Sequence, residues 1–176
     1  KLARDIKINT LYEGTTYIQS MDLIGRKWTM EKGAVFSRWI QSITDFYEIN
    51  TNTPGWEKEF EQLGKAIKSY QEIQMCLAGF SKDKNKAGLI PTYAKRIMMA
   101  TAQLYGGHLL LDQALLAEKK IQELGQDHYD FKFYQGKIMA ARYFLLNVVP
   151  EVAGLAEIVK LADTSILDID IECFEY

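Results

Sequence analysis

Hydrophobic residues recur every three or four positions along most of the chain, and strict alternation of apolar and polar residues is scarce. This spacing places apolar side chains on one face and is typical of amphipathic helices. The pattern predicts a first helix from about Thr15 to Phe46, which would be roughly 45 Å long at 1.5 Å per residue. Its apolar stripe consists of Met21, Ile24, Trp28, Val35, Trp39, Ile43 and Phe46.

Turn-forming residues separate this segment from the next predicted helix. Residues 50–55 combine Asn, Thr, Pro and Gly, which is a strong signal for a break in helical structure. Thr53 is a candidate N-cap, with Pro54 at the first helical position, where its missing N–H has no cost. The second helix then runs to about Phe80, and the polar, basic residues 81–88 are expected to form an exposed connection.

The second half of the chain contains two further long helices. The third begins near Ile90 and stops at Gly125, because glycine is a common residue just past a helix end. Either Asp127 or Asp130 can cap the fourth, which Pro150 must kink or restart because proline removes a backbone hydrogen bond. Four long helices joined by short loops predict an all-α protein, an antiparallel up-down four-helix bundle.

Composition argues against several classes of function. The 176 residues are 48% hydrophobic and 25% charged, which is typical of one globular domain. The net charge is −2, so we expect no nucleic-acid partner, because duplex binding requires a positive field. Polar residues and proline interrupt the longest apolar stretch, 143–159, so we expect no membrane span. Two cysteines, Cys76 and Cys173, cannot form a disulfide framework, which favours a reducing, cytoplasmic setting.

Most residues that could carry chemistry have a simpler structural interpretation. His108 lies on an apolar stripe with no second ligand four residues away, so a hydrogen-bonded structural histidine is favoured over a metal ligand. Gly106 and Gly107 lack the flanking pattern of a phosphate-binding loop, and close helix packing explains them better. Glu57 and Glu61 fit an exposed helix surface, so we expect no metal site. The remaining candidates are expected to be solvated or buried as apolar residues: His128, Cys76, Lys82, Lys84 and Lys86.

The start of the chain carries a more specific pattern. Residues 4–19 contain an Arg-Asp-x-Lys-Ile run, then Tyr-Glu-Gly-Thr, then Ile-Gln on the following helix. This arrangement resembles the carboxy-terminal signature of the flavin-dependent acyl-CoA dehydrogenases. Residues 20–27 and 162–165 are similar to a subgroup with an extra helical domain, which includes broad-specificity and 3-methylmercaptopropionyl-CoA dehydrogenases. The resemblance divides the chain into the end of the dehydrogenase core (1–30), a helical extension (31–163) and a tail (164–176).

The resemblance implies that the intact enzyme desaturates an acyl-CoA thioester between its α- and β-carbons, with FAD as the hydride acceptor. Glu13 matches the glutamate of the family's Tyr-Glu-Gly-Thr and would be the catalytic base that removes the α-proton. From spacing alone, the same residue would instead be a capping carboxylate at the start of the next helix. The other implied contacts are Gly14 and Tyr12 with the substrate, and Thr15, Thr16 and Tyr17 with FAD.

The family's FAD site needs domains that this sequence does not show. The chain alone is therefore expected to be inactive and colourless, as the carboxy-terminal part of a longer enzyme, and its start at Lys1 fits that expectation. Tightly bound, stoichiometric FAD on the purified chain would contradict it.

Three interpretations of the helical extension stay open. It is a structural domain that forms a homo-oligomer contact, a surface for a partner such as an electron-transfer flavoprotein, or a helix that binds a membrane surface. The last is least favoured, because the third and fourth helices carry mixed charge rather than a basic face. The alternative to an enzyme is a non-catalytic helical oligomerisation or interaction module.

Overall fold

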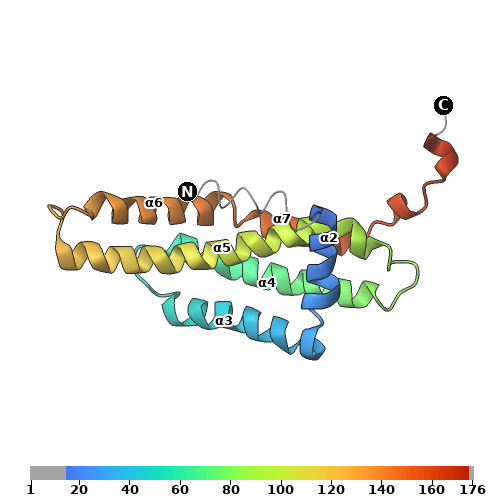
Figure 1. Cartoon of the computed structure of the whole chain (residues 1–176), viewed down its shortest axis with the longest axis horizontal. Coiled ribbons are helices and arrows are strands. Elements are labelled where there is room, and N and C mark those ends of the chain that lie inside the picture. Colours follow the sequence, from blue (N-terminus) through green and yellow to red (C-terminus); the bar gives the residue numbers. More distant parts are fainter. Residues whose placement is uncertain (1–14, 175–176) are drawn as a thin grey trace.

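The computed structural model describes residues 15–174, and every regular element within that range is helical. The all-α prediction is therefore confirmed. The longer helices are α3 (Ala34–Asn50), α4 (Glu57–Phe80), α5 (Leu89–Leu124), α6 (Phe131–Asn147) and α7 (Glu151–Leu161). Figure 1 shows α3, α4, α5 and α6 lying along one axis, with the chain direction reversing from each helix to the next.

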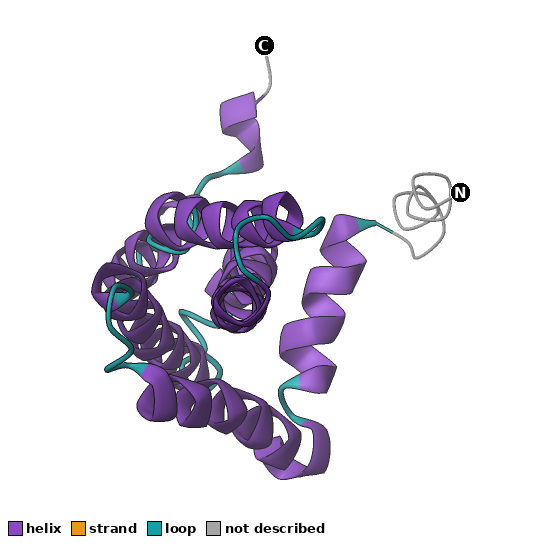
Figure 2. Cartoon of the chain, turned by 90° about the vertical axis from the view of Figure 1, so that its left-hand side faces the viewer, coloured by secondary structure: helices purple, strands orange, loops and turns teal. Residues whose placement is uncertain are grey.

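The prediction of one helix over residues 15–46 is wrong. The chain instead forms α2 (Thr16–Met21), the π-helix η2 (Asp22–Lys27) and the 3-10 segment η3 (Met30–Gly33) before α3 begins. Glu31, Lys32 and Gly33 have φ angles of +50°, +56° and +90°, which lie outside the right-handed helical region and break the helix. As a result, α2 runs across the bundle rather than along it, as Figure 1 and Figure 2 show.

The predicted start of α4 is also wrong. Gly55 has a φ of +81°, so a right-handed helix cannot begin before it, and Trp56 occupies the N-cap position instead of Thr53. The Thr53 hydroxyl donates a hydrogen bond to the carbonyl oxygen of Asn50 at 2.7 Å, within the turn that precedes the helix. Pro54 therefore belongs to that turn rather than to the first turn of α4.

The remaining helix boundaries agree better with the sequence. Gly125, with a φ of +81°, follows α5 directly, and Pro150 separates α6 from α7, so both predicted stops are confirmed. Asp130 occupies the N-cap position of α6, but its side chain makes no capping hydrogen bond. The prediction that Asp130 caps α6 is therefore right about the N-cap position, but the expected side-chain hydrogen bond to the helix is not formed.

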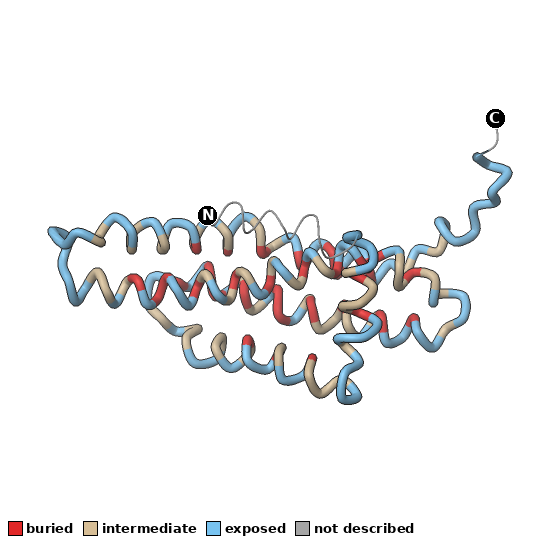
Figure 3. Tube along the Cα trace, in the orientation of Figure 1, coloured by how far each residue is buried: buried red, intermediate tan, exposed pale blue. Residues whose placement is uncertain are grey.

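The hydrophobic core lies between α4 and α5 and extends to the inner faces of their neighbours. Figure 3 shows the buried positions on the sides of α4, α5 and α6 that face one another, whereas the outer side of α6 is exposed. Ile24 after α2 and Val152 on α7 belong to the same cluster of buried residues, so one core holds all these helices together. Burying each such aliphatic or aromatic side chain fully stabilises the folded state by about 1.5–3 kcal/mol relative to leaving it exposed. Within residues 15–174, no helix combines the length and apolarity needed to cross a membrane.

Two adjacent glycines allow α5 and α6 to approach closely. A Cβ atom placed on Gly107 would lie 2.6 Å from Cγ2 of Val149, and one on Gly106 would lie 3.4 Å from Cζ of Phe144. Real Cβ contacts essentially never fall below 3.0 Å, so only Gly107 strictly requires the missing side chain. The packing interpretation of this glycine pair is confirmed.

Candidate functional site

The residues implied to act on the substrate lie outside the described part of the chain. Tyr12, Glu13 and Gly14 precede residue 15, so their roles stay predictions. The next three residues, implied to contact FAD, are described. They open α2, as the sequence predicts.

The start of α2 presents one anchored side and one exposed side. Thr15 is the N-cap, and its Oγ1 accepts a hydrogen bond from the amide nitrogen of Ile18 at 3.3 Å. Thr16 and Tyr17 are exposed, the latter by 55%. One turn further along, the fully buried Ser20 donates its hydroxyl hydrogen to the carbonyl oxygen of Tyr17 at 2.8 Å. The Thr16 and Tyr17 side chains are therefore free to meet another molecule or domain.

The segment after α2 fixes it to the bundle. The Trp28 ring lies 5.1 Å from the Phe36 ring and 5.8 Å from the Tyr70 ring, measured between centroids, at angles typical of favourable aromatic pairs. The Arg26 guanidinium donates two hydrogen bonds to the Asp22 carboxylate, at 2.5 and 2.8 Å, and the pKa of that carboxyl is lowered mainly by this bond. The Trp28 contacts pack the segment after α2 against α3 and α4, the Arg26–Asp22 pair lies within η2, and α2 itself lies against α5.

The aromatic cluster around Trp28 is structural rather than catalytic. The Tyr70 hydroxyl forms a hydrogen bond with the Thr101 hydroxyl, and burial raises the pKa of Tyr70 far above its usual range. The phenol therefore stays neutral and cannot serve as an acid or base near pH 7. A pocket of about 170 Å³ beside the cluster is lined mainly by apolar groups, from Leu23, Lys27, Trp28, Val35, Phe36, Trp39 and Thr101.

An ion pair between the half-exposed Arg142 and the buried Glu59 joins the start of α4 to α6. The Arg142 guanidinium donates hydrogen bonds to Oε1 of Glu59 at 2.9 Å and to the Gly55 carbonyl oxygen at 3.0 Å, and it stacks 4.3 Å above the Trp56 ring. Glu59 is only 2% exposed. The Trp56 indole N–H in turn donates to Oε2 of Glu118 on α5 at 2.9 Å. The sequence interpretation missed this network, although Glu59 occupies a position on the apolar stripe of α4.

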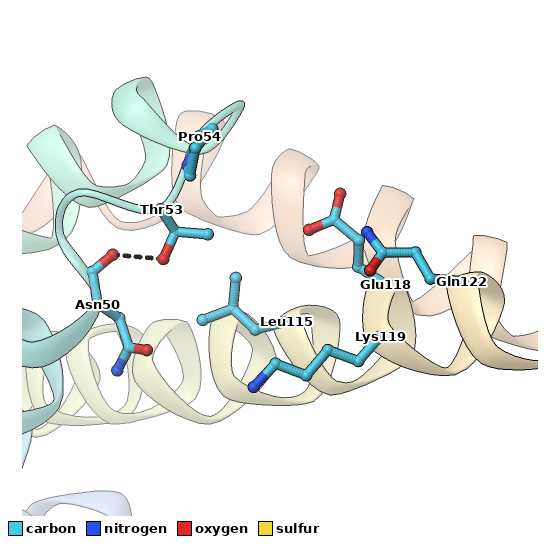
Figure 4. A pocket seen from close by; sticks show the side chains of 7 residues that line it. All are labelled: Asn50, Thr53, Pro54, Leu115, Glu118, Lys119 and Gln122. Carbon is cyan, nitrogen blue, oxygen red and sulfur yellow. Dashed lines mark hydrogen bonds between the residues drawn. The ribbon is translucent and has the colours of Figure 1, made fainter.

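A pocket of about 340 Å³ lies next to this network, between the loop before α4 and the second half of α5 (Figure 4). It is lined by Asn50, Thr53, Pro54, Leu115, Glu118, Lys119 and Gln122. Its one carboxylate, on Glu118, already accepts the Trp56 hydrogen bond, and the lining has no histidine or cysteine. The pocket therefore lacks a nucleophile with an adjacent base.

His108 lies inside the bundle, as predicted, but without the expected hydrogen bond. Its ring packs 4.6 Å from the Phe46 ring and 5.9 Å from the Tyr105 ring, between centroids. Its buried Nδ1 has no hydrogen-bond partner within residues 15–174. Burial lowers the pKa of His108, and the charge of Asp112 one turn later opposes this only in part. The folded protein therefore favours the neutral imidazole.

This pKa shift predicts a pH-dependent loss of stability. The unfolded chain binds a proton near pH 6.5, above the pKa of the folded state, so protonation favours unfolding as the pH falls below that value. Denaturant unfolding between pH 7.5 and 5.5 measures this effect. As the pH falls, the free energy of unfolding should decrease more steeply for the wild type than for His108→Phe, which has no imidazole to protonate. Equal slopes for the two proteins would show that this histidine does not contribute.

The other candidate residues behave as expected from the sequence. Glu57 and Glu61 are exposed, Cys76 is partly buried, and Nδ1 of His128 accepts a hydrogen bond from the Asp130 amide at 3.2 Å in an exposed turn. In the described range 15–174, no group of three or more His, Cys, Asp or Glu residues is arranged to hold a metal ion. The described residues thus offer positioning and packing rather than a catalytic cluster of their own.

Comparison with known proteins identifies the family. Residues 39–170 match a family model described as "Acetyl-CoA dehydrogenase C-terminal like". A butyryl-CoA dehydrogenase of Syntrophomonas wolfei is 44% identical over 167 residues, which cover 95% of this chain. The chain belongs to the acyl-CoA dehydrogenase family. The family suggested by the motif in residues 4–19 is therefore confirmed.

Other acyl-CoA dehydrogenases are similar over almost the whole chain. A broad-specificity linear acyl-CoA dehydrogenase of Mycobacterium tuberculosis is 29% identical over 97% of it, and a 3-methylmercaptopropionyl-CoA dehydrogenase of Ruegeria pomeroyi is 31% identical over 92%. The chain spans only 26–28% of the length of the relatives it matches. Most of each relative therefore lies outside the region of similarity.

Acyl-CoA dehydrogenases generally use FAD, and the described residues fit a contact with such a group in part. Thr16 and Tyr17 expose hydroxyl groups that can donate or accept hydrogen bonds. The Thr15 hydroxyl accepts the bond from Ile18 and keeps its own hydrogen available to donate. These residues can supply edge contacts to a flavin cofactor but do not enclose one.

Proposed function

We propose that this chain is the carboxy-terminal part of a longer acyl-CoA dehydrogenase, which introduces an α,β double bond into an acyl-CoA thioester. The main support is the 44% identity to a butyryl-CoA dehydrogenase over nearly the whole chain, together with the Tyr-Glu-Gly-Thr motif just before α2. FAD bound to the whole enzyme would accept the hydride that leaves the β-carbon. The products are then an enoyl-CoA and the reduced cofactor.

Within this proposal, Glu13 is the base that takes the α-proton, and the motif residues beside it contact substrate or FAD. A carboxylate removes a weakly acidic proton efficiently only when it is held close to it. The Trp28 contacts and the buried Ser20 pack α2 and the segment after it onto the bundle, and the motif comes directly before α2 in the sequence, which supports the proposal. The roles proposed for the motif residues are substrate contacts for Gly14 and Tyr12, and FAD contacts for Thr15, Thr16 and Tyr17.

The partners and setting follow from the same proposal. An electron-transfer flavoprotein would reoxidise the reduced cofactor, and the enzyme would be a homo-oligomer in the cytoplasm, where its two free cysteines stay reduced. The chain alone is not expected to retain FAD, because the described residues provide only edge contacts. Short linear acyl-CoAs are the first substrates to test, since one relative is named for butyryl-CoA.

The test uses the whole enzyme that carries this chain. The purified enzyme should show flavin absorbance, which an acyl-CoA substrate bleaches under anaerobic conditions. Glu13→Gln should bind the same thioester but slow the bleaching by about 10²–10⁴-fold, the usual contribution of a general base. Glu48→Gln, an exposed position on α3, is the matched control and should bleach at the wild-type rate.

Other outcomes separate the alternatives. If Glu13→Gln bleaches as fast as the wild type, the family assignment stands and the proposed base is wrong. If the whole protein binds no flavin, the dehydrogenase proposal fails, and a helical interaction module becomes the better hypothesis.

A further inference from the structure

The end of the chain forms an exposed arm, defined here as residues 163–174. Its Leu167 still lies against Gly88 at the start of α5, whereas the outer end of the arm runs away from the helical body (Figure 1). The side chains of Ile166, Ile169, Ile171 and Phe174 are between 45% and 76% exposed, an unusual amount of apolar surface for so short a segment. Because exposed apolar side chains gain free energy on burial, the arm is suited to dock on another surface.

The arm is also acidic. Its charged side chains are Asp163, Asp168, Asp170 and Glu172, with no lysine or arginine among them. Both carboxylate oxygens of Asp163 already bond Ser165, at 3.0 Å to its amide and 2.9 Å to its hydroxyl. The carboxylates further along remain at the exposed end, where they can meet a basic surface.

A groove of matching character lies between α5 and α7, with a volume of about 580 Å³. Its walls are formed by Lys95, Arg96, Met99, Gln103, Glu151, Gly154, Leu155 and Ile158. Met99 and Ile158 are 50% and 42% exposed and provide an apolar floor. A Cβ atom on Gly154 would meet nothing within 4 Å, so the groove is open at that point.

The charges of the groove complement those of the arm. Lys95 and Arg96 are exposed, and neither forms an ion pair with any residue in the described range. The carboxylate of Glu151, the acidic residue of the groove, accepts a hydrogen bond from Gln103 at 2.5 Å. The two cations are therefore available to the arm's carboxylates, while its isoleucines cover the apolar floor. Such complementarity favours one orientation of docking.

We propose that the arm of one copy docks in the α5/α7 groove of a second copy, so that each copy supplies one arm and one groove. An exchange of this kind is symmetric and closes as a dimer. The outer end of a copy's own arm runs away from the helical body beyond α7 (Figure 1), so the second copy is the better occupant. The inference rests on the proposed homo-oligomer and is independent of the flavin chemistry, so sizing tests it whatever the bleaching assay shows.

The test uses charge-reversed variants of the 176-residue chain, which has a single core of its own. K95E/R96E reverses the two cations of the groove, and D168K/D170K reverses two of the four acidic residues of the arm. By sedimentation velocity, the wild type should dimerise, and each variant should have a dimer dissociation constant at least tenfold higher. K58E/K68E, which reverses two exposed lysines on α4, is the matched control and should dimerise like the wild type.

Mixing the two variants makes the test specific for exchange between copies. In a mixed dimer, the substituted lysines of one arm meet the substituted glutamates of one groove, and the unchanged arm meets the unchanged groove, so the mixture should dimerise more tightly than either variant alone. Gly154→Trp, which fills the groove without meeting a neighbouring atom at its Cβ, should weaken the wild-type dimer at unchanged helical content by circular dichroism. A monomeric wild type, a mixture that stays monomeric, or dimers that persist in both variants would overturn the proposal.

Discussion

Replacing Arg142 with alanine is expected to lower the free energy of unfolding by about 1–3 kcal/mol, because it takes the cationic partner from the buried Glu59 carboxylate, although the Arg142 side chain is itself 42% exposed. The same change removes the hydrogen bond to the Gly55 carbonyl and the stacking on Trp56. Arg142→Lys should also destabilise, since an ammonium group cannot reproduce the planar guanidinium that makes these contacts together. Urea denaturation followed by circular dichroism at pH 7 measures the effect.

Two comparisons show whether the buried charge is the cause. The double variant Glu59→Leu/Arg142→Leu removes both charges and should recover much of the lost stability, as replacement of buried ion pairs by apolar residues often does. Lys65→Ala breaks an exposed pair with Glu61 on the same helix, in which both side chains are more than half exposed, and should change stability little. A double variant as unstable as Arg142→Ala would contradict the explanation.

The sequence predicted those parts of the fold that depend only on interactions within one helix or at its ends. The apolar stripes of α4 and α5, the stop at Gly125 and the restart after Pro150 depend on neighbours within one or two turns. The prediction of one continuous helix through residues 29–33 is wrong because the apolar stripe continues on both sides of them. Periodicity alone therefore joined two separate helices. The break depends on two non-glycine residues in the left-handed region, Glu31 and Lys32, a conformation that sequence pattern seldom reveals.

In the candidate site too, the sequence predicted what depends on a local motif and missed what depends on contacts between helices. The assignment of Glu13 comes from the family resemblance of residues 4–19 and stays a prediction, whereas the family membership itself is confirmed by the comparisons. The Glu59–Arg142 pair joins residues 83 positions apart, and a charged residue on an apolar stripe is the only local sign of it. The ring contact between His108 and Phe46 likewise joins two helices, and no spacing within α5 indicates it. Interactions across helices were therefore the part that sequence patterns could not supply.

The second large effect is expected where α5 packs against the end of α6 and the turn that follows it. Gly107→Ala adds a methyl group that would lie 2.6 Å from Cγ2 of Val149, a fully buried and β-branched side chain with little freedom to move. Overpacking of this kind costs about 1–3 kcal/mol, which exceeds the gain of up to about 1 kcal/mol from replacing glycine within a helix. We expect a net loss of stability, seen as a lower midpoint of thermal or urea unfolding.

The neighbouring glycine supplies a matched control on the same helix. Gly106→Ala places its methyl group 3.4 Å from the Phe144 ring, an ordinary contact distance, so it should keep the helix-propensity gain and leave the protein as stable as the wild type or more so. Combining Gly107→Ala with Val149→Ala removes the clashing methyl group. The double variant should therefore lose less stability than the two single variants lose together. If Gly107→Ala is as stable as Gly106→Ala, the two helices can separate at little cost, and the glycine pair is not what sets their distance.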